Sequence, residues 1–471
     1  MRDLLLARRR LVVVARSSKR QSVSERIESL LQRWERQLDQ ELPRPVCLEG
    51  DLSQAYLGLN EQSRQWLAEN CSSIIHSAAA LTFVEEANGE PWRTNVEGTR
   101  HVLELCEDAN ICEMHYVSTA YVCGTRTERI YEDELKLGQN FRNVYEQSKL
   151  QAETLVRQAT YLDDLTVYRP AVIAGDSQTG YTSTYHGLFM YLQLMCVLAR
   201  NTEPGPDGVR HTSLELHIAG DEPRNVIPVD WTAEVICHLF TTPSAHGRTY
   251  HLAPRNRMTA RQMIEAGYTY FNSTGVKFVG PSSSTARPAR GMGQDVFENS
   301  GLYREYEASD PEFDTSNLQE FAGHLPCPDI DEAMLHRFMK YGEEDRWGKR
   351  RWPKARTPFC VGTYLERLES AQSRVALANG SKLEQTIGLD VTGSGGGQWT
   401  LTFADGQLVT LETGVQSTCS TQLKISSTQF SELANSVVGT SAPDLADGHV
   451  GSVAQLTQLL GVELVNAVER Y

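Results

Sequence analysis

The stretch that decides the fold is LVVVARSSKRQSVSERIESLLQRWERQLDQELPRPVCLEGD, residues 11–51. It begins and ends with short apolar runs, Leu11–Arg16 and Val46–Asp51, which are typical of buried strands. Between them, Ser22–Gln40 predicts an amphipathic helix, and its first serine is followed three residues later by Glu25, as in a capping box. A strand, a helix and a strand in this order indicate two parallel strands joined by a crossover helix.

The same alternation continues through the first third of the chain. Further apolar runs of strand length alternate with helical patterns, which predicts a parallel sheet covered on both faces. The fold class expected is therefore α/β, a Rossmann-like doubly wound sheet. The additional strands expected are Ser73–Ala79, Met114–Thr119 and Leu165–Val172, and the additional helices are Thr94–Asp108 and Asn143–Thr160.

Composition narrows the classes of protein that this chain can belong to. A length of 471 residues predicts two or three domains, and a net charge of -15 argues against a nucleic-acid partner. The ten cysteines are scattered singly, without Cys-x-x-Cys, which favours a reducing cytoplasm and predicts no structural zinc or other metal site. The most apolar run, Leu188–Ala199, is shorter than the roughly 20 residues of a membrane span.

The residues best suited to chemistry lie on one predicted helix and at the end of one predicted strand. Tyr145 and Lys149 are four residues apart, so the phenol and the ammonium share a helix face, and a nearby cation favours the phenolate. The alternative is an exposed tyrosine beside a surface lysine. Ser118 and Thr119 follow an apolar strand at the edge where open α/β sheets bind ligands, or they only cap that strand.

A second strand end carries small side chains. His76 is followed by Ser77, Ala78 and Ala79, which would let a cofactor approach the backbone. A single histidine at such a place is more often structural than catalytic. Asn95 opens the next helix, where it binds a ligand or only satisfies buried polar groups.

Taken together, these elements resemble the extended short-chain dehydrogenase/reductase family, and within it the thioester reductase and fatty acyl-CoA reductase branch. The resemblance covers about residues 2–290. It rests on GDL at Gly50–Leu52, HSAA at His76–Ala79, TNVEGT at Thr94–Thr99, VSTAYV at Val117–Val122, YEQSK at Tyr145–Lys149, YRPAVIAGDSQTG at Tyr168–Gly180 and RNVIPVDW at Arg224–Trp231.

The resemblance implies a role for each of the catalytic candidates. Thr119 would hydrogen-bond the substrate carbonyl with Ser118 beside it, Tyr145 would donate the proton, and Lys149 would hold the nicotinamide ribose and lower the pKa of Tyr145. The reaction implied is hydride transfer to a thioester carbonyl, an aldehyde or a ketone. The loop Asp176–Gly180 and the apolar segment Tyr185–Ala199 would border an acyl site.

The resemblance also implies a cofactor site. Asp51 would face the adenine, and Arg16, at the position that meets a 2′-phosphate, favours NADPH over NADH, unless it is only a surface arginine. The backbone at Pro170–Val172 would contact the carboxamide. The further cofactor contacts implied are Leu52, Ser77, Ala78, Asn95, Pro170 and Val172, together with Tyr145 and Lys149.

One element of the family is missing from the sequence. The strand and the Gly-x-x-Gly-x-x-Gly turn that normally precede the first helix have no counterpart, because residues 2–10 already resemble the end of that helix. The Gly393–Gly397 run lies between two later strands and is typical of a hairpin loop. The sequence therefore predicts either an N-terminally truncated reductase, which the intact downstream residues favour, or a domain with a degenerate cofactor site.

The last hundred residues have a different character. Apolar and polar residues alternate in Ile387–Thr392, Gln398–Phe403, Gln407–Thr413 and Thr421–Ser426, which predicts antiparallel strands, with helices at Thr363–Ala378, Thr428–Ser436 and Gly451–Leu460. This part resembles a sterol carrier protein-2-like lipid-binding domain, with an ordinary packed core as the alternative. The domains expected are 1–290, a helical extension and basic linker at 291–365, and 366–471.

The sequence thus predicts a cytoplasmic NADPH-dependent reductase of fatty acyl thioesters or a related lipid carbonyl, fused to a lipid carrier. A non-catalytic lipid-binding protein and an extended-family dehydrogenase acting on a sterol or nucleotide-sugar are the alternatives. Arg346–Arg356, a basic run with two tryptophans, would touch anionic lipid headgroups at a membrane surface or the phosphates of coenzyme A, or would serve only as a linker. The resemblance also allows a homodimer.

Overall fold

The computed structural model describes residues 1–18, 21–216, 218–280, 309–350, 360–370, 385–404, 407–416, 418–419 and 421–435. The chain forms two compact units. The first consists of Met1–Asp51, Leu59–Asn70 and Pro353–Tyr471, and the second of Leu52–Gly58 and Cys71–Trp352. The expected boundary at residue 290 lies outside the described residues, so the three-domain division stays a prediction.

The second unit is built on a four-stranded parallel sheet. Its strands follow the order β10-β5-β4-β3, and each pairs in parallel with its neighbour. This confirms a Rossmann-like parallel sheet for this part of the chain. The strands are β3 (Ser73–His76), β4 (Glu113–Val117), β5 (Asp164–Pro170) and β10 (Thr249–Leu252).

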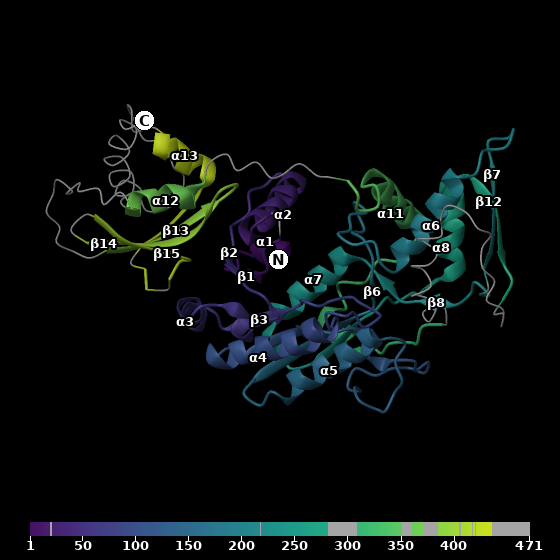
Figure 1. Ribbon diagram of the computed structural model, residues 1–471, viewed down its shortest axis with the longest axis horizontal. Coiled ribbons are helices and arrows are strands. Elements are labelled where there is room, and N and C mark those ends of the chain that lie inside the picture. Colours follow the sequence, from purple (N-terminus) through teal and green to yellow (C-terminus); the bar gives the residue numbers. More distant parts are fainter. Residues whose placement is uncertain are drawn as a thin grey trace. The chain divides into compact units, whose positions relative to one another are not determined.

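Helices cover both faces of this sheet, as Figure 1 shows for α5 (Val144–Gln158) and α7 (Val229–Phe240). Tyr168 on β5 packs in the same apolar cluster as residues of α7, whereas the next residue, Arg169, pairs with Glu153 on α5. Because successive side chains of a strand point to opposite faces, the two helices lie on opposite faces of the sheet. Helix α4 (Gly98–Asp108) packs against α5 and follows a π-helical turn at Arg93–Glu97.

A second apolar cluster of this unit joins helices α6, α8 and α11. The expected apolar segment 188–199 forms α6, whose buried residues include Leu192 and Met195. The bounds are α6 (Leu188–Arg200), α8 (Ala260–Tyr270) and α11 (Glu332–Glu344), next to the parallel pair β7 (Arg210–Leu216) and β12 (Ser273–Phe278).

The first unit contains the opening strand–helix–strand segment. Strand β1 (Val12–Ala15) pairs in parallel with β2 (Val46–Glu49), and α2 (Val23–Leu38) joins them. The capping box of α2 is confirmed, because the Ser22 side chain accepts from the Glu25 backbone and the Glu25 side chain accepts from that of Ser22. In the part of the chain that the structure describes, β1 and β2 form a sheet of their own rather than extending the four-stranded one.

The C-terminal sheet of the first unit is mixed. Its strand order is β15-β14-β13-β16, and β13 pairs antiparallel with β14 but parallel with β16. The expectation of purely antiparallel strands was therefore wrong, because β16 reaches the edge beside β13 instead of forming a hairpin with β15. The elements are α12 (Val361–Ser370), β13 (Gln385–Thr392), β14 (Gly397–Ala404), β15 (Gln407–Thr413), β16 (Thr421–Ser426) and α13 (Ser427–Asn435). The expected helix at 451–460 lies outside the described residues.

Among the described residues, no helix has both the length and the apolar character needed to cross a membrane. The remaining elements are short. The short elements are α1 (Arg2–Leu6), η1 (Ala55–Gly58), α3 (Glu61–Asn70), η3 (Ala120–Cys123), β6 (Val172–Ile173), β8 (Pro223–Arg224), β9 (Val226–Ile227), η4 (Pro243–Ala245), β11 (Met258–Thr259) and α10 (Ser316–Ala322).

Candidate active site

A cavity of about 500 Å³ opens at the carboxyl ends of β4 and β5 in the second unit. This is the edge at which open parallel sheets bind ligands. Much of the predicted site comes together in its wall. The predicted residues that line it are Ser77, Ser118, Thr119, Tyr145, Lys149, Pro170 and Val172.

Tyr145 lies in the first turn of α5, which begins after Asn143, whose side chain caps the helix by accepting from the backbone of Glu146. The phenol is partly buried in the cavity wall and packs beside the ring of Phe83. Burial raises the pKa of Tyr145 to about 12, although a hydrogen bond with Thr119 opposes the shift. Tyr145 is therefore a neutral phenol near pH 7, which is the proton-donating form.

Lys149 is one helical turn further along α5 and is almost completely buried. Its Nζ donates to the hydroxyl of Tyr116 at 2.9 Å and to the carbonyl of Val117 at 2.8 Å. Burial lowers the pKa of Lys149 to about 7, against the opposing charge of Glu153. The expected lowering of the Tyr145 pKa by Lys149 is not seen, because burial outweighs any such attraction and Lys149 is held by Tyr116 and Val117.

Ser118 and Thr119 follow directly after β4, and their hydroxyls have different hydrogen-bond partners. The Thr119 side chain caps η3 by accepting from the backbone of Tyr121 and remains in the cavity wall. The Ser118 hydroxyl instead donates to Glu153 at 2.6 Å. Ser118 is thus fastened to the interior of the unit, and Thr119 is the hydroxyl that is better placed for a substrate carbonyl.

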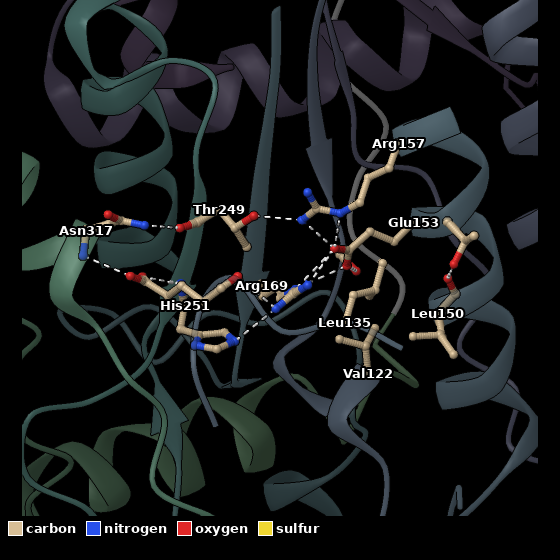
Figure 2. A network of polar contacts seen from close by, with 12 residues as sticks. Val122, Leu135, Leu150, Glu153, Arg157, Arg169, Thr249, His251 and Asn317 are labelled. Atoms are coloured by element: carbon tan, nitrogen blue, oxygen red, sulfur yellow. Dashed lines mark hydrogen bonds and ion pairs between the residues drawn. The ribbon is translucent and has the colours of Figure 1, made fainter. Parts of the chain in front are cut away.

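Glu153 belongs to a buried ionic network beneath the site, which Figure 2 shows. Both Glu153 and Arg169 have fully buried side chains, and Arg169 Nη2 lies 2.7 Å from Glu153 Oε1. Arg157 adds a second guanidinium at 2.8 Å. Burial alone would raise the pKa of Glu153, but the charge and hydrogen bonds of Arg169 outweigh it and lower that pKa to about 2.

The far side of the network ties β10 to the start of α10. Arg169 Nη1 donates to the carbonyl of Glu132 at 3.3 Å and contacts His251 Nε2 at 3.4 Å. The Glu132 carboxylate accepts from the backbones of His251 and Asn317. Figure 2 shows the contacts that run from Glu153 through Arg169 to His251. Because Ser118 donates to Glu153, this continuous set of polar contacts holds the strand end that carries Ser118.

Asn95 does not line the cavity but holds its wall. Its side chain accepts from Ala80 N at 2.8 Å and donates to Ala80 O and to Ser148 Oγ, so the loop after β3 is joined to α5. His76 at the end of β3 contacts Thr99 Oγ1 at 3.0 Å, and burial lowers its pKa to about 3. Both residues fit the structural alternatives given for them, with every polar atom of the Asn95 side chain occupied.

The remaining cofactor candidates are distributed over both units. Ala78 is exposed beside Ser77, and Leu52 lies near α4, where its carbonyl contacts His101 Nδ1 at 2.7 Å. Arg16 and Asp51 belong to the first unit. Their expected contacts with the adenine and the 2′-phosphate stay predictions.

The sequence reasoning found one part of the apolar wall and missed another. Leu188 and Tyr191, from the expected border Tyr185–Ala199, line the cavity, whereas the expected border Asp176–Gly180 does not. Met258 and Met263 also line it and were not predicted. Arg224 and Asp310 are the charged residues of this wall besides Lys149. Burial raises the pKa of Asp310, which accepts from Tyr121 Oη at 3.0 Å and from Asn225 N at 2.8 Å. The RNVIPVDW motif begins at Arg224 and so pointed to that residue, whereas Asp310 lies outside every motif noted in the sequence.

The comparison with protein families agrees with this geometry. A model of an NAD-binding family described as Male sterility protein matches residues 1–236, half of the chain. The chain belongs to this family. It has the Rossmann-like parallel sheet on which such proteins are built.

Individual relatives support the same assignment. Aldehyde reductase lnaA of Aspergillus flavus is 26% identical over 65% of this chain and 31% of its own length. A putative fatty acyl-CoA reductase of Drosophila melanogaster, CG8306, is 37% identical over 24% of this chain and 23% of its own length. The matched part thus spans about a third or less of these curated relatives.

Solved structures show the same fold. The terminal R domain from the myxalamid PKS-NRPS biosynthetic pathway superposes with a TM-score of 0.58 at 24% identity, covering 74% of this chain and 88% of that domain. A thiolation-reductase di-domain from an archaeal non-ribosomal peptide synthetase gives a TM-score of 0.54 at 18% identity, covering 72% of this chain and 70% of that one.

Proposed function

We propose that the chain is an NADPH-dependent reductase of acyl thioesters or a related lipid carbonyl, with Tyr145 as the proton donor. The observation that carries the proposal is a cavity that places Tyr145, Thr119 and Lys149 together beside a long apolar wall. The names of relatives, an aldehyde reductase and a putative fatty acyl-CoA reductase, support the same reaction class.

The cavity wall fits the nicotinamide half of such a cofactor. Small side chains at Ser77 and Ala79 leave the backbone after β3 accessible. Lys149 has three N–H groups and uses two of them on Tyr116 and Val117, so one remains for a ribose hydroxyl. Pro170 and Val172 would contact the carboxamide. Bound NADPH would supply the hydride, which is the redox part of the reaction.

The protein would supply the proton and the orientation of the carbonyl. The carbonyl oxygen would accept hydrogen bonds from Thr119 and Tyr145, and the Tyr145 proton would pass to that oxygen as negative charge develops on it. With a thioester, this step gives a hemithioacetal. Its carbon–sulfur bond then breaks, its hydroxyl proton passes to the departing sulfur, and water reprotonates Tyr145, so the products are an aldehyde, a free thiol and NADP⁺. The buried Glu153–Arg169 pair would hold the strand end in place.

The pKa of Lys149 predicts how the reaction depends on pH. Its pKa of about 7 means that the ammonium is present below pH 7 and is lost as the pH rises above it. We expect kcat/KM, which reports the free enzyme, to fall up to about tenfold for each pH unit above 7. Lys149→Arg keeps the positive charge and should move this fall to higher pH. A wild-type profile that stays level up to pH 9 would contradict this role of Lys149.

The apolar wall predicts selectivity for the acyl chain. Met263 of α8 lines it, and Met263→Trp should exclude the distal methylenes of a long chain. Each excluded methylene should cost about 0.8 kcal/mol, or roughly fourfold in kcat/KM, and short acyl-CoA substrates should be unaffected. Competition between short and long acyl-CoA, a sterol ketone and a nucleotide-sugar would measure this. Turnover of only the sugar nucleotide would refute the lipid assignment.

We propose further that the C-terminal sheet is a lipid carrier module of the sterol carrier protein-2 type. Its support is a four-stranded sheet whose buried residues pack with α12 and α13 in one apolar cluster that includes Leu389, Leu401 and Phe430. The test is mass spectrometry of organic extracts of the purified full chain. A stoichiometric acyl lipid or sterol is expected, and a lipid-free protein that also takes up no fluorescent fatty acid would favour an ordinary packed core.

A further inference from the structure

Two histidines and two carboxylates meet at the edge of the four-stranded sheet opposite to the candidate active site. Glu113 and Asp164 are the first residues of β4 and β5 and are partners in the parallel register. His115 lies two residues after Glu113, on the same face of β4, and His246 follows η4. We infer that this cluster binds a divalent transition-metal ion such as Zn²⁺.

The donor atoms converge without a cysteine. One ligand atom each of Glu113, His115 and His246 lies within 4.8 Å of the others. His115 Nε2 is 3.1 Å from Glu113 Oε1, and His246 Nδ1 is 3.9 Å from the same oxygen and 4.0 Å from Asp164 Oδ2. The last two separations are too long for hydrogen bonds, but a shared cation accounts for the convergence.

The tautomer of His246 strengthens the assignment. Its Nε2 lies 3.0 Å from the carbonyl of Phe240, which only accepts, so Nε2 carries the hydrogen. Nδ1 is then the ring nitrogen that is free for a metal ion, and it faces two carboxylate oxygens. A metal ion placed among these acceptors would be coordinated by nitrogen and oxygen together. Asp164 Oδ1 supports this, because it is buried without a hydrogen-bond partner among the described residues.

The surroundings hold these donors in place. The backbone of Gly247 donates to Thr166 Oγ1 at 3.0 Å, which fixes the loop that carries His246 to β5. His115 Nδ1 lies 2.8 Å from Tyr168 Oη, and such outer contacts orient metal-binding histidines. Imidazole nitrogen with carboxylate oxygen favours Zn²⁺, Co²⁺ or Ni²⁺ over Mg²⁺ or Ca²⁺.

No motif in the sequence indicates this site. The expectation of no metal site rested on Cys/His spacing along the chain, whereas these ligands come from three separate segments at 113–115, 164 and 246. Their place at the start of β4 and β5, away from Thr119 at the other end of β4, makes the ion structural rather than catalytic.

Cobalt titration of the chelator-treated full chain tests this inference. We expect one equivalent of Co²⁺ to give visible d–d bands without the near-ultraviolet charge-transfer band that thiolate ligands produce. The melting temperature should rise with the metal concentration, as it does for any ligand of the folded state. Absence of binding, or a thiolate-type spectrum alone, would overturn the assignment.

Matched variants locate the metal. Glu113→Gln preserves shape at a partly exposed position, so it should fold, and His246→Ala removes the second histidine. Each should weaken Co²⁺ binding by more than the roughly 10–100-fold caused by loss of an outer contact. His211→Ala, at an exposed histidine on β7, should leave binding unchanged. Equal affinity in the wild type and in both cluster variants would refute this location.

Discussion

Tyr145→Phe should lower kcat for reduction of an acyl thioester by about 10²–10⁴-fold, the usual contribution of a positioned proton donor. The phenol lines the cavity beside Thr119, and burial raises its pKa to about 12, so it is protonated over the whole neutral range. Removing one hydroxyl leaves the ring contact with Phe83 intact, so the site should keep its shape. Stopped-flow and steady-state oxidation of NADPH would measure the change.

The binding of the cofactor separates a chemical defect from a structural one. NADPH affinity of the Tyr145→Phe variant should stay within a few-fold of the wild type, because Lys149 and the strand ends are unchanged. Tyr131→Phe, at an exposed tyrosine outside the cavity, serves as the matched control and should retain full activity. Full activity in the Tyr145→Phe variant would show that another group delivers the proton.

Glu153→Gln should destabilise the protein by about 3–5 kcal/mol, because it leaves the guanidinium of Arg169 buried without its counter-charge. The same change weakens the acceptor for Ser118, so the end of β4 should also loosen. Chemical denaturation with fluorescence detection would measure the free energy of unfolding. The matched control is Glu97→Gln, which breaks an exposed ion pair with Arg100 and should cost at most about 1 kcal/mol.

The ion pair between Glu153 and Arg169 also predicts how the free energy of unfolding decreases at low pH. The pKa of Glu153 is lowered from 4.5 to about 2, so its stabilising effect is present above pH 4.5 and is lost as the pH falls towards 2. The Glu153→Gln variant should lack this component of the acid transition. Equal losses of stability in the Glu97→Gln and Glu153→Gln variants would contradict the account of the buried network.

Local patterns in the sequence predicted local structure well. The capping box at Ser22, the strands that become β3 to β5 and the helix that carries Tyr145 and Lys149 all depend on neighbouring residues. Parallel strands then bring their carboxyl ends to one edge, so the meeting of Tyr145 with Thr119 followed from topology.

Contacts between residues far apart in the chain could not be predicted from the sequence. Nothing near Ser118 indicates that its hydroxyl is taken by Glu153, because that carboxylate comes from α5 and is held by Arg169 on a neighbouring strand. The parallel pairing of β16 with β13 was missed for the same reason. The pKa of Tyr145 also depends on how much wall surrounds it, which spacing from Lys149 alone does not report.

Isotope transfer tests the central claim most directly. The full chain would be incubated with an acyl-CoA and NADPH deuterated at the transferable C4 position, and the products would be analysed by mass spectrometry and thiol titration. The account predicts an aldehyde, or the alcohol formed from it, with deuterium at C1 and one free thiol released for each thioester consumed. Folded, NADPH-bound protein that transfers no deuterium to any acyl thioester would contradict the assignment as a thioester reductase.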